Sequence, residues 1–279
     1  MILYNTKEGI IIANNGVYYD YKGAVFGDLL LEENVYQKLR QEIPHLKENS
    51  SFKVDNNPAL LAPIGSQEVW AAGVTYFKSR TARMEESASS GGSDFYDRVY
   101  DAPRPELFFK SNAYRVRGHE QKVRVRKDSK WNVPEPEFTL VIHPNKTIIG
   151  YTIGNDMSSR SIEGENPLYL PQAKSYNGST ALGPGIYLTD QPLPEKTKIS
   201  IDIERKGKSI FSGETTRANL KRSFEELIDY LFIEIDFAQG CFLMTGTGIV
   251  PPTGFSLQAD DKIAIQVDSI GTLINTVDL

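Results

Sequence analysis

The sequence is short of cysteine and of long apolar runs, and each shortage excludes a class of protein. The single cysteine, Cys241, rules out an intrachain disulfide and a cysteine-rich zinc site, and it suits a reducing compartment. No uninterrupted apolar run approaches the ~18 residues that a membrane helix needs. Lys7 and Glu8 lie where a signal peptide would be apolar. We therefore expect a cytoplasmic protein with no membrane contact.

A strong excess of positive charge is also absent. The chain has 31 Lys and Arg against 36 Asp and Glu, which gives a formal charge of -5. Such a chain has no field that would hold a nucleic-acid backbone, so we expect no nucleic-acid partner, although a local basic pocket can still bind a small anion. The 279 residues are 40% hydrophobic, with ordinary Gly and Pro usage. This composition favours a globular fold over collagen-like, coiled-coil or disordered chains.

Strand patterns outnumber helix patterns along the chain. Asn14-Asn15-Gly16 is a hairpin signal, and helical spacing runs from Leu31 to Leu46, with Pro44 limiting the helix near its carboxyl end. The Asn-, Ser- and Pro-rich stretch that follows marks a boundary. Hairpins are predicted around residues 143–146 and 206–208, a helix over 224–232, and short strands over 262–277. We predict an α+β, mainly β, fold with a small N-terminal domain (1–60) and a catalytic domain (61–279).

Three further segments carry predictions of their own. The Ser- and Gly-rich residues 87–93 separate two short helical patterns and predict a linker or the mobile tip of a lid. The apolar flanks of Cys241 predict an inert core thiol at the start of a strand. Four arginines alternate with valines and predict a strand with one solvated charged face: Arg115, Arg117, Arg124 and Arg126.

The sharpest cluster of candidate functional residues is acidic. In an extended chain Glu135 and Glu137 point to the same face, and Asp156 ends the next strand of the predicted hairpin, so the three can converge. Carboxylates that close together repel unless a cation neutralises them, and an all-oxygen set suits Mg²⁺, Mn²⁺ or Ca²⁺. The spacing alone fits a solvated acidic edge equally well.

Weaker signals lie around this cluster. A desolvated Lys174 can act as a base, although a lone lysine is more often a surface charge. Glu106, before the apolar Leu107-Phe108-Phe109 run, is either a general acid or simply the start of a strand. The turn from Thr245 to Gly248 offers hydroxyls and bare amides that can cradle a carboxylate, which is also ordinary turn chemistry. Three histidines have no partner at zinc-ligand spacing and are expected to be structural or surface residues: His45, His119 and His143.

Together these motifs resemble the fumarylacetoacetate hydrolase family. The resemblance runs from about Val69 to the carboxyl terminus and rests on the segments 135–138, 150–160, 172–175, 182–184, 245–247 and 270–273. It implies a β-rich roll, commonly dimeric, with a smaller N-terminal domain. It also implies Mg²⁺ or Mn²⁺ ligands at Glu135, Glu137 and Asp156, and a catalytic lysine at Lys174.

Further residues gain a role only through this resemblance. Thr247 looks like a substrate-contacting residue, and we place Gly246 and Lys110 with it as substrate-binding. Longer stretches, residues 104–110, 128–137 and 165–172, resemble the dehydratases of 2-keto-3-deoxy sugar acids, in which Glu106 and Lys174 would form the acid/base pair. Which of the two is the base stays open.

Two other functions remain as alternatives. A carbon-carbon hydrolase of acylpyruvates or other diketo acids would use the same metal site, but the family's hydrolases activate water with a His-Glu pair, and residues 75–93 contain no histidine. Ser161 and Glu163 also differ from the Asp and Gln that these hydrolases usually carry. A non-catalytic organic-acid-binding protein is the remote alternative. The sequence therefore favours a metal-dependent dehydratase with a small 2-keto acid as substrate, in a homodimer or dimer-based oligomer.

Overall fold

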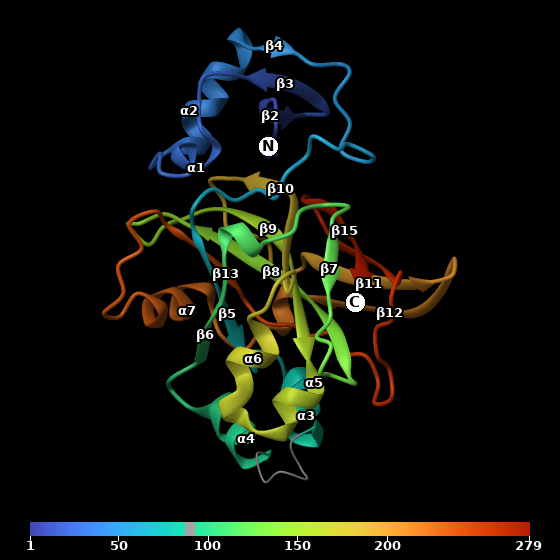
Figure 1. Cartoon of the computed structure of the whole chain (residues 1–279). Helices are drawn as coiled ribbons and strands as arrows, with labels where there is room; N and C mark the ends of the chain where they lie inside the picture. Colours follow the sequence, from blue (N-terminus) through green and yellow to red (C-terminus); the bar gives the residue numbers. More distant parts are fainter. Residues whose placement is uncertain (87–92) are drawn as a thin grey trace.

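The computed structural model describes residues 1–86 and 93–279. Within them, most of the regular structure is extended (Figure 1). The strands are β1 (Ile2–Thr6), β2 (Gly9–Asn14), β3 (Val17–Tyr21), β4 (Lys47–Glu48), β5 (Glu68–Gly73), β6 (Glu106–Asn112), β7 (Lys122–Arg124), β8 (Asn132–Ile142), β9 (Ile148–Ser159), β10 (Thr180–Leu188), β11 (Lys198–Arg205), β12 (Lys208–Thr216), β13 (Cys241–Met244), β14 (Lys262–Val267) and β15 (Gly271–Asp278).

The helices of the described residues are short. They are α1 (Phe26–Leu29), α2 (Val35–Glu42), α3 (Phe77–Glu86), α4 (Ser93–Asp101), α5 (Arg160–Glu165), α6 (Leu170–Lys174) and α7 (Phe224–Leu231). In Figure 1, α1 and α2 lie with the first strands at one end of the molecule, and α3 to α6 gather at the opposite end. None of the described helices is long and apolar enough to cross a membrane.

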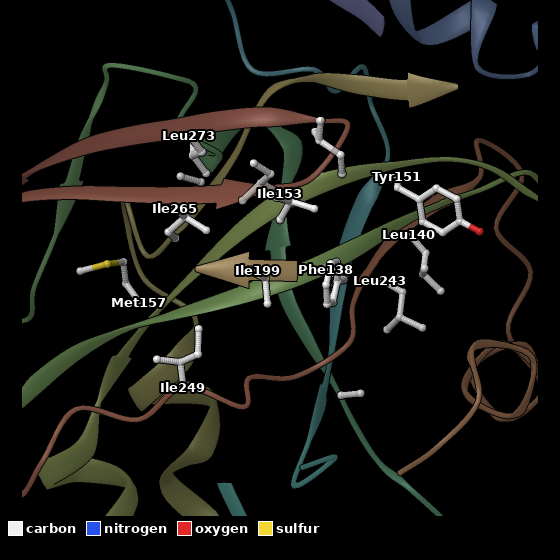
Figure 2. Close-up of a cluster of buried hydrophobic side chains, with 14 of the residues drawn as sticks. Phe138, Leu140, Tyr151, Ile153, Met157, Ile199, Leu243, Ile249, Ile265 and Leu273 are labelled. Carbon is white, nitrogen blue, oxygen red and sulfur yellow. The ribbon is translucent and has the colours of Figure 1, made fainter. Parts of the chain in front are cut away.

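The described strands form two sheets. The larger one has 10 strands in the order β4-β3-β2-β1-β10-β9-β8-β13-β5-β6, and the smaller one has 5 in the order β12-β11-β14-β15-β7. Apolar residues of both sheets pack together, as Figure 2 shows for Phe138 and Ile153 on one side and Ile199, Ile265 and Leu273 on the other. The mainly β fold is thus confirmed. Because β1 pairs with β10, the large sheet runs from the N-terminal strands into the body, and a domain boundary at residue 60 stays a prediction.

The predicted hairpins are confirmed. Asn15 (φ 51°) and Gly16 (φ 81°) join β2 to β3, and Lys206 (φ 53°) and Gly207 (φ 74°) join β11 to β12. Positive φ at both central residues matches the twist of the flanking strands, which is why Asn and Gly favour such turns. The strand predicted at Cys241 is β13, which lies parallel to β5 and antiparallel to β8.

Two local predictions need correction, and one cannot be compared. The helix expected over Leu31–Leu46 begins only at Val35 as α2, and near its carboxyl end, where Pro44 was expected to limit it, a 3₁₀ turn follows over Ile43–His45. The arginine-rich run is not one strand: a 3₁₀ turn over Ala113–Arg115 precedes the short β7. Most of the predicted Ser- and Gly-rich lid tip, residues 87–92, lies outside the described residues.

Candidate active site

The acidic cluster forms where β8 and β9 run side by side. Every residue of β8 is buried, and the register places Glu135 opposite Asp156 and Glu137 opposite Gly154. Glu135, Glu137 and Asp156 are 3%, 1% and 1% exposed, and one carboxylate oxygen of each lies within 4.8 Å of the others. The predicted convergence therefore occurs, and full burial excludes the solvated acidic edge. An all-oxygen set this close fits a hard divalent cation.

One oxygen of each carboxylate is held by a backbone N–H or by a positively charged side chain of the protein. Arg160 Nη2 donates to Glu135 Oε1 at 2.8 Å. The backbone N–H of Gly246 donates to Glu137 Oε2 at 2.6 Å. Lys110 Nζ lies 2.8 Å from Asp156 Oδ1 in a buried ion pair. The orientations of the three carboxylates are thus set by groups from three other parts of the chain.

Lys174, the last residue of α6, reaches the cluster with its side-chain amine. Its Nζ donates to Glu135 Oε2 at 2.6 Å, to Asp156 Oδ2 at 3.0 Å and to Ser158 Oγ at 2.5 Å. Oε1 of Glu163 lies 3.8 Å from the same nitrogen. The residue is 1% exposed, so Lys174 is a buried amine among carboxylates and not a surface charge.

Glu106 opens onto the same cavity from another edge. It is the first residue of β6 and pairs with Gly73, the last residue of β5. A side chain on Gly73 would place its Cβ 2.1 Å from Glu106 Oε2, so the glycine leaves the space that the carboxyl occupies. Glu106 lines one cavity together with the acidic cluster and Lys174, which is the arrangement that acid/base chemistry at a bound molecule requires.

Gly246 and Thr247 line the cavity as well. Gly246 has φ +90°, and a Cβ there would lie 2.0 Å from Thr75 Oγ1, so only glycine fits and can offer its N–H to Glu137. The Thr247 hydroxyl accepts from the N–H of Ile249 and donates to its carbonyl, both at 3.2 Å. These bonds fix the threonine at the wall of the cavity.

Lys110 lies in a different place from the other predicted residues. It is 0% exposed and is not among the residues that line the cavity, and its amine lies 2.8 Å from Asp156 Oδ1. Besides Asp156, the amine donates to the carbonyls of Met157 and Lys174. Substrate binding by Lys110 stays a prediction.

Burial sets the electrostatics of the cluster. It raises the pKa of Glu137 well above the ordinary value, and the neighbouring charges of Asp156 and Glu135 add to the rise. Burial likewise lowers the pKa of the Lys110 amine, against the opposing effect of Asp156. Both shifts reflect the cost of holding charge away from water, which a bound cation would offset at the carboxylates.

The histidines lie elsewhere. Among the described residues, no histidine lines the cavity. His119 is buried, and its Nε2 lies 3.3 Å from Asp55 Oδ1, beside Glu120. Asp55 is largely exposed and also borders a wider hollow in the N-terminal part, which contains none of the predicted site residues. The acidic cluster, not the wider hollow, therefore marks the candidate active site.

Three residues that shape the site received no role from the sequence. Ser158 follows Asp156 by two positions in β9, so the alternation of a strand could have placed it on the same face. Arg160 begins α5, and Gly73 ends β5. Nothing in the local pattern of either residue indicates its partner, because Arg160 meets Glu135 and Gly73 meets Glu106 only in the folded chain.

Comparison with known proteins identifies the family of this chain. The family profile described as "Fumarylacetoacetate (FAA) hydrolase C-terminal" matches residues 69–278. The chain belongs to the fumarylacetoacetate hydrolase family. Among family members, it is 44% identical over 216 residues to a "Probable 2-keto-3-deoxyxylonate dehydratase" of Haloferax volcanii, covering 77% of this chain and 73% of that protein.

Two further matches cover more of the chain. A "2-dehydro-3-deoxy-D-arabinonate dehydratase" of Saccharolobus solfataricus is 42% identical over 229 residues, which cover 81% of this chain and 76% of that one. The solved structure of a 2-keto-3-deoxy-D-arabinonate dehydratase complexed with magnesium and 2,5-dioxopentanoate has a TM-score of 0.83 at 32% identity. That match covers 99% of this chain and 98% of the other. The N-terminal part of this chain therefore also shares the fold of that dehydratase.

Proposed function

We propose that this protein is a Mg²⁺-dependent hydro-lyase that converts a 2-keto-3-deoxy pentonate to 2,5-dioxopentanoate. The observation that carries the proposal is the placement of Lys174 and Glu106 on the cavity that the buried carboxylates line. The two dehydratases that are 44% and 42% identical act on five-carbon acids of this kind by name, and the dehydratase bound to 2,5-dioxopentanoate and magnesium supports the product and the metal.

Glu135, Glu137 and Asp156 would hold the cation. Their buried oxygens lie close enough together to share one ion, and the raised pKa of Glu137 shows the cost of leaving their charge uncompensated. When bound, Mg²⁺ or Mn²⁺ supplies a Lewis acid that polarises the keto group of the substrate and neutralises negative charge. The remaining chemistry falls to side chains of the chain itself.

Lys174 and Glu106 are the two groups that move protons in the proposed reaction. Lys174 takes a proton from C3 as the neutral amine, a form that requires the cation to compensate the charges of Glu135 and Asp156, which otherwise hold it as an ammonium with three donated hydrogen bonds. Glu106, as the acid, gives a proton to the C4 hydroxyl, which leaves as water. The C3–C4 double bond then forms. Transfer of a proton from C5 to C3 gives the C4–C5 enol, and its ketonisation at C4 gives the C5 aldehyde. The net change is loss of one water, with no oxidation or reduction.

The substrates named for the two relatives have only one stereocentre each. A 2-keto-3-deoxy pentonate has no stereocentre at C2 or C3, so acids derived from D-arabinonate and D-xylonate share their only remaining centre, C4. The same compound therefore fits both names in the D series. Substrate discrimination in this protein should thus depend on chain length and on the C4 configuration.

A panel of keto acids tests the proposal. The purified protein is incubated with Mg²⁺ and 2-keto-3-deoxy acids of five and six carbons in both C4 configurations, and semialdehyde product is measured. Acylpyruvates are assayed in parallel for release of pyruvate. Faster cleavage of an acylpyruvate than dehydration of any sugar acid would replace the proposal with a carbon-carbon hydrolase. Binding by calorimetry without any turnover would favour a non-catalytic organic-acid-binding protein.

We also propose a homodimer or dimer-based oligomer of two-part subunits (1–60 and 61–279) in the cytoplasm. The family resemblance supports the dimer and the smaller N-terminal domain, and a single buried cysteine suits a reducing compartment. Light scattering at two protein concentrations measures the assembly. A monomer at both would contradict it.

A further inference from the structure

We propose that Lys110 is a positioning residue that aligns Asp156 as a metal ligand and Lys174 as the catalytic amine. The inference rests on the proposed metal site and gives Lys110 a role other than substrate binding. Its basis is that one buried ammonium contacts both residues: Asp156 through the side chain and Lys174 through the backbone carbonyl.

The position of Lys110 in the fold makes this double contact possible. Lys110 lies in β6, the edge strand of the large sheet, whereas Asp156 lies in β9 and Lys174 ends α6. These elements are not neighbours in the order of the sheet. The Lys110 side chain therefore ties together three segments that carry different parts of the site.

The contacts use the full donor capacity of the ammonium. A lysine ammonium has three N–H donors. Its nitrogen lies 2.8 Å from Asp156 Oδ1, donates to Met157 O at 3.3 Å, and donates to Lys174 O. Because the side chain is 0% exposed and lies outside the cavity lining, no donor is left to turn toward a bound keto acid.

Asp156 is held from both sides by lysines. Lys110 contacts Oδ1, and Lys174 contacts Oδ2 at 3.0 Å. Glu135 and Glu137 are held by Arg160 and by the Gly246 N–H, whereas the Lys110 donor that holds Asp156 also reaches the backbone carbonyl of Lys174. Removing Lys110 would take away the contact at Asp156 Oδ1, leaving the one to Lys174 at Oδ2, and would remove the donor to the carbonyl at the end of α6. Mutation of a residue that contacts a metal ligand in this way typically lowers metal affinity ~10- to 100-fold.

The test compares variants of Lys110 with a matched surface lysine. Lys110→Met removes the charge and all donors at similar length, and Lys110→Gln keeps a neutral donor. Lys122→Met is the control, because Lys122 also pairs with an aspartate, Asp278 at 3.4 Å, but is exposed. Each protein is assayed for Mn²⁺ affinity by electron paramagnetic resonance, for kcat and KM, and for thermal unfolding.

We expect the Mn²⁺ Kd of Lys110→Met to rise ~10- to 100-fold, with a fall in kcat at saturating metal. Lys110→Gln should lie between Lys110→Met and the wild type, and the control should stay within about twofold of the wild type for both readouts. An unchanged Mn²⁺ Kd and kcat in folded Lys110→Met, with only a lower Tm, would make Lys110 a structural residue and overturn the proposal.

Two other outcomes would also overturn it. A rise in KM alone would restore substrate binding as the role of Lys110, and failure of both Lys110 variants to fold would assign it to folding. Mn²⁺ affinity needs no turnover. If the wild type binds Mn²⁺ in a Lys110-dependent manner yet dehydrates no sugar acid, the positioning role holds and the proposed reaction fails.

Discussion

The carboxyl group of Glu106 lies directly against the Cα of Gly73, across the antiparallel pair of β5 and β6. A Cβ on residue 73 would approach Glu106 Oε2 to 2.1 Å and Cδ to 2.5 Å. The pairing places the proposed acid at the cavity while the glycine leaves its carboxyl a place to lie. The absence of a side chain at Gly73 therefore allows the Glu106 carboxyl to lie at the cavity.

We expect Gly73→Ala to displace the Glu106 carboxyl and lower kcat ~10²-fold or more, in the range for loss of a general acid. Because the effect acts through Glu106, the double variant with Glu106→Gln should be no slower than Glu106→Gln alone. Steady-state kinetics of the two single variants and the double variant measure this. Additive losses would show that Gly73→Ala acts elsewhere.

Lys174→Met and Glu106→Gln should each lower turnover ~10²- to 10⁴-fold, because each removes one proton-transferring group. Kinetics with Mg²⁺ at saturation, together with metal content and circular dichroism, give the comparison. Lys198→Met is a control, since its ion pair with Glu214 is exposed. Near-normal turnover of both variants, folded and metal-loaded, would refute the mechanism.

Without metal, stability should fall as pH rises, owing to Glu137. Burial and the charges of Asp156 and Glu135 raise its pKa above the ordinary 4.5, so the folded state keeps a proton that the unfolded chain has lost. The contribution of Glu137 is fully present below about pH 4.5 and is lost as pH rises through the raised value. Urea unfolding in chelator at several pH values measures it.

Two controls accompany this pH series. Glu137→Gln has no group to titrate there, so its stability relative to the wild type should improve with rising pH. Saturating Mn²⁺ should stabilise the wild type most at the high end of the series, because binding to the folded state alone adds stability by mass action. A metal-free wild type and Glu137→Gln with parallel pH curves would contradict the assignment.

Cys241 should be unreactive in the folded protein. It is 0% exposed at the start of β13, and burial raises the pKa of its thiol, so little thiolate forms at pH 8. Alkylation should yield about one labelled thiol per chain in urea and almost none under native conditions. Native labelling at the rate of a free thiol would show that β13 opens.

Much of the candidate site was predictable from strand periodicity. The alternation of an extended chain puts Glu135 and Glu137 on one face, and the hairpin around residues 143–146 brings β9 back so that Asp156 faces Glu135. Lys174 and Glu106 had no such local support and depended on the family resemblance. The predicted helix over Leu31–Leu46 began too early, because hydrophobic spacing does not mark the first helical residue, which is Val35, whereas Pro44 did mark the carboxyl end.

The sequence by itself determined the mainly β fold, its tight turns and the convergence of three acidic residues, since these follow from local chain geometry with a period of two. Tertiary structure alone decided that Lys110 pairs with Asp156, 46 positions away in sequence, and that the Gly246 N–H donates to Glu137, 109 positions away. No periodicity relates such distant residues. Their contacts arise only when both sheets have packed and water has left the site, so that each buried charge must find a partner within the fold.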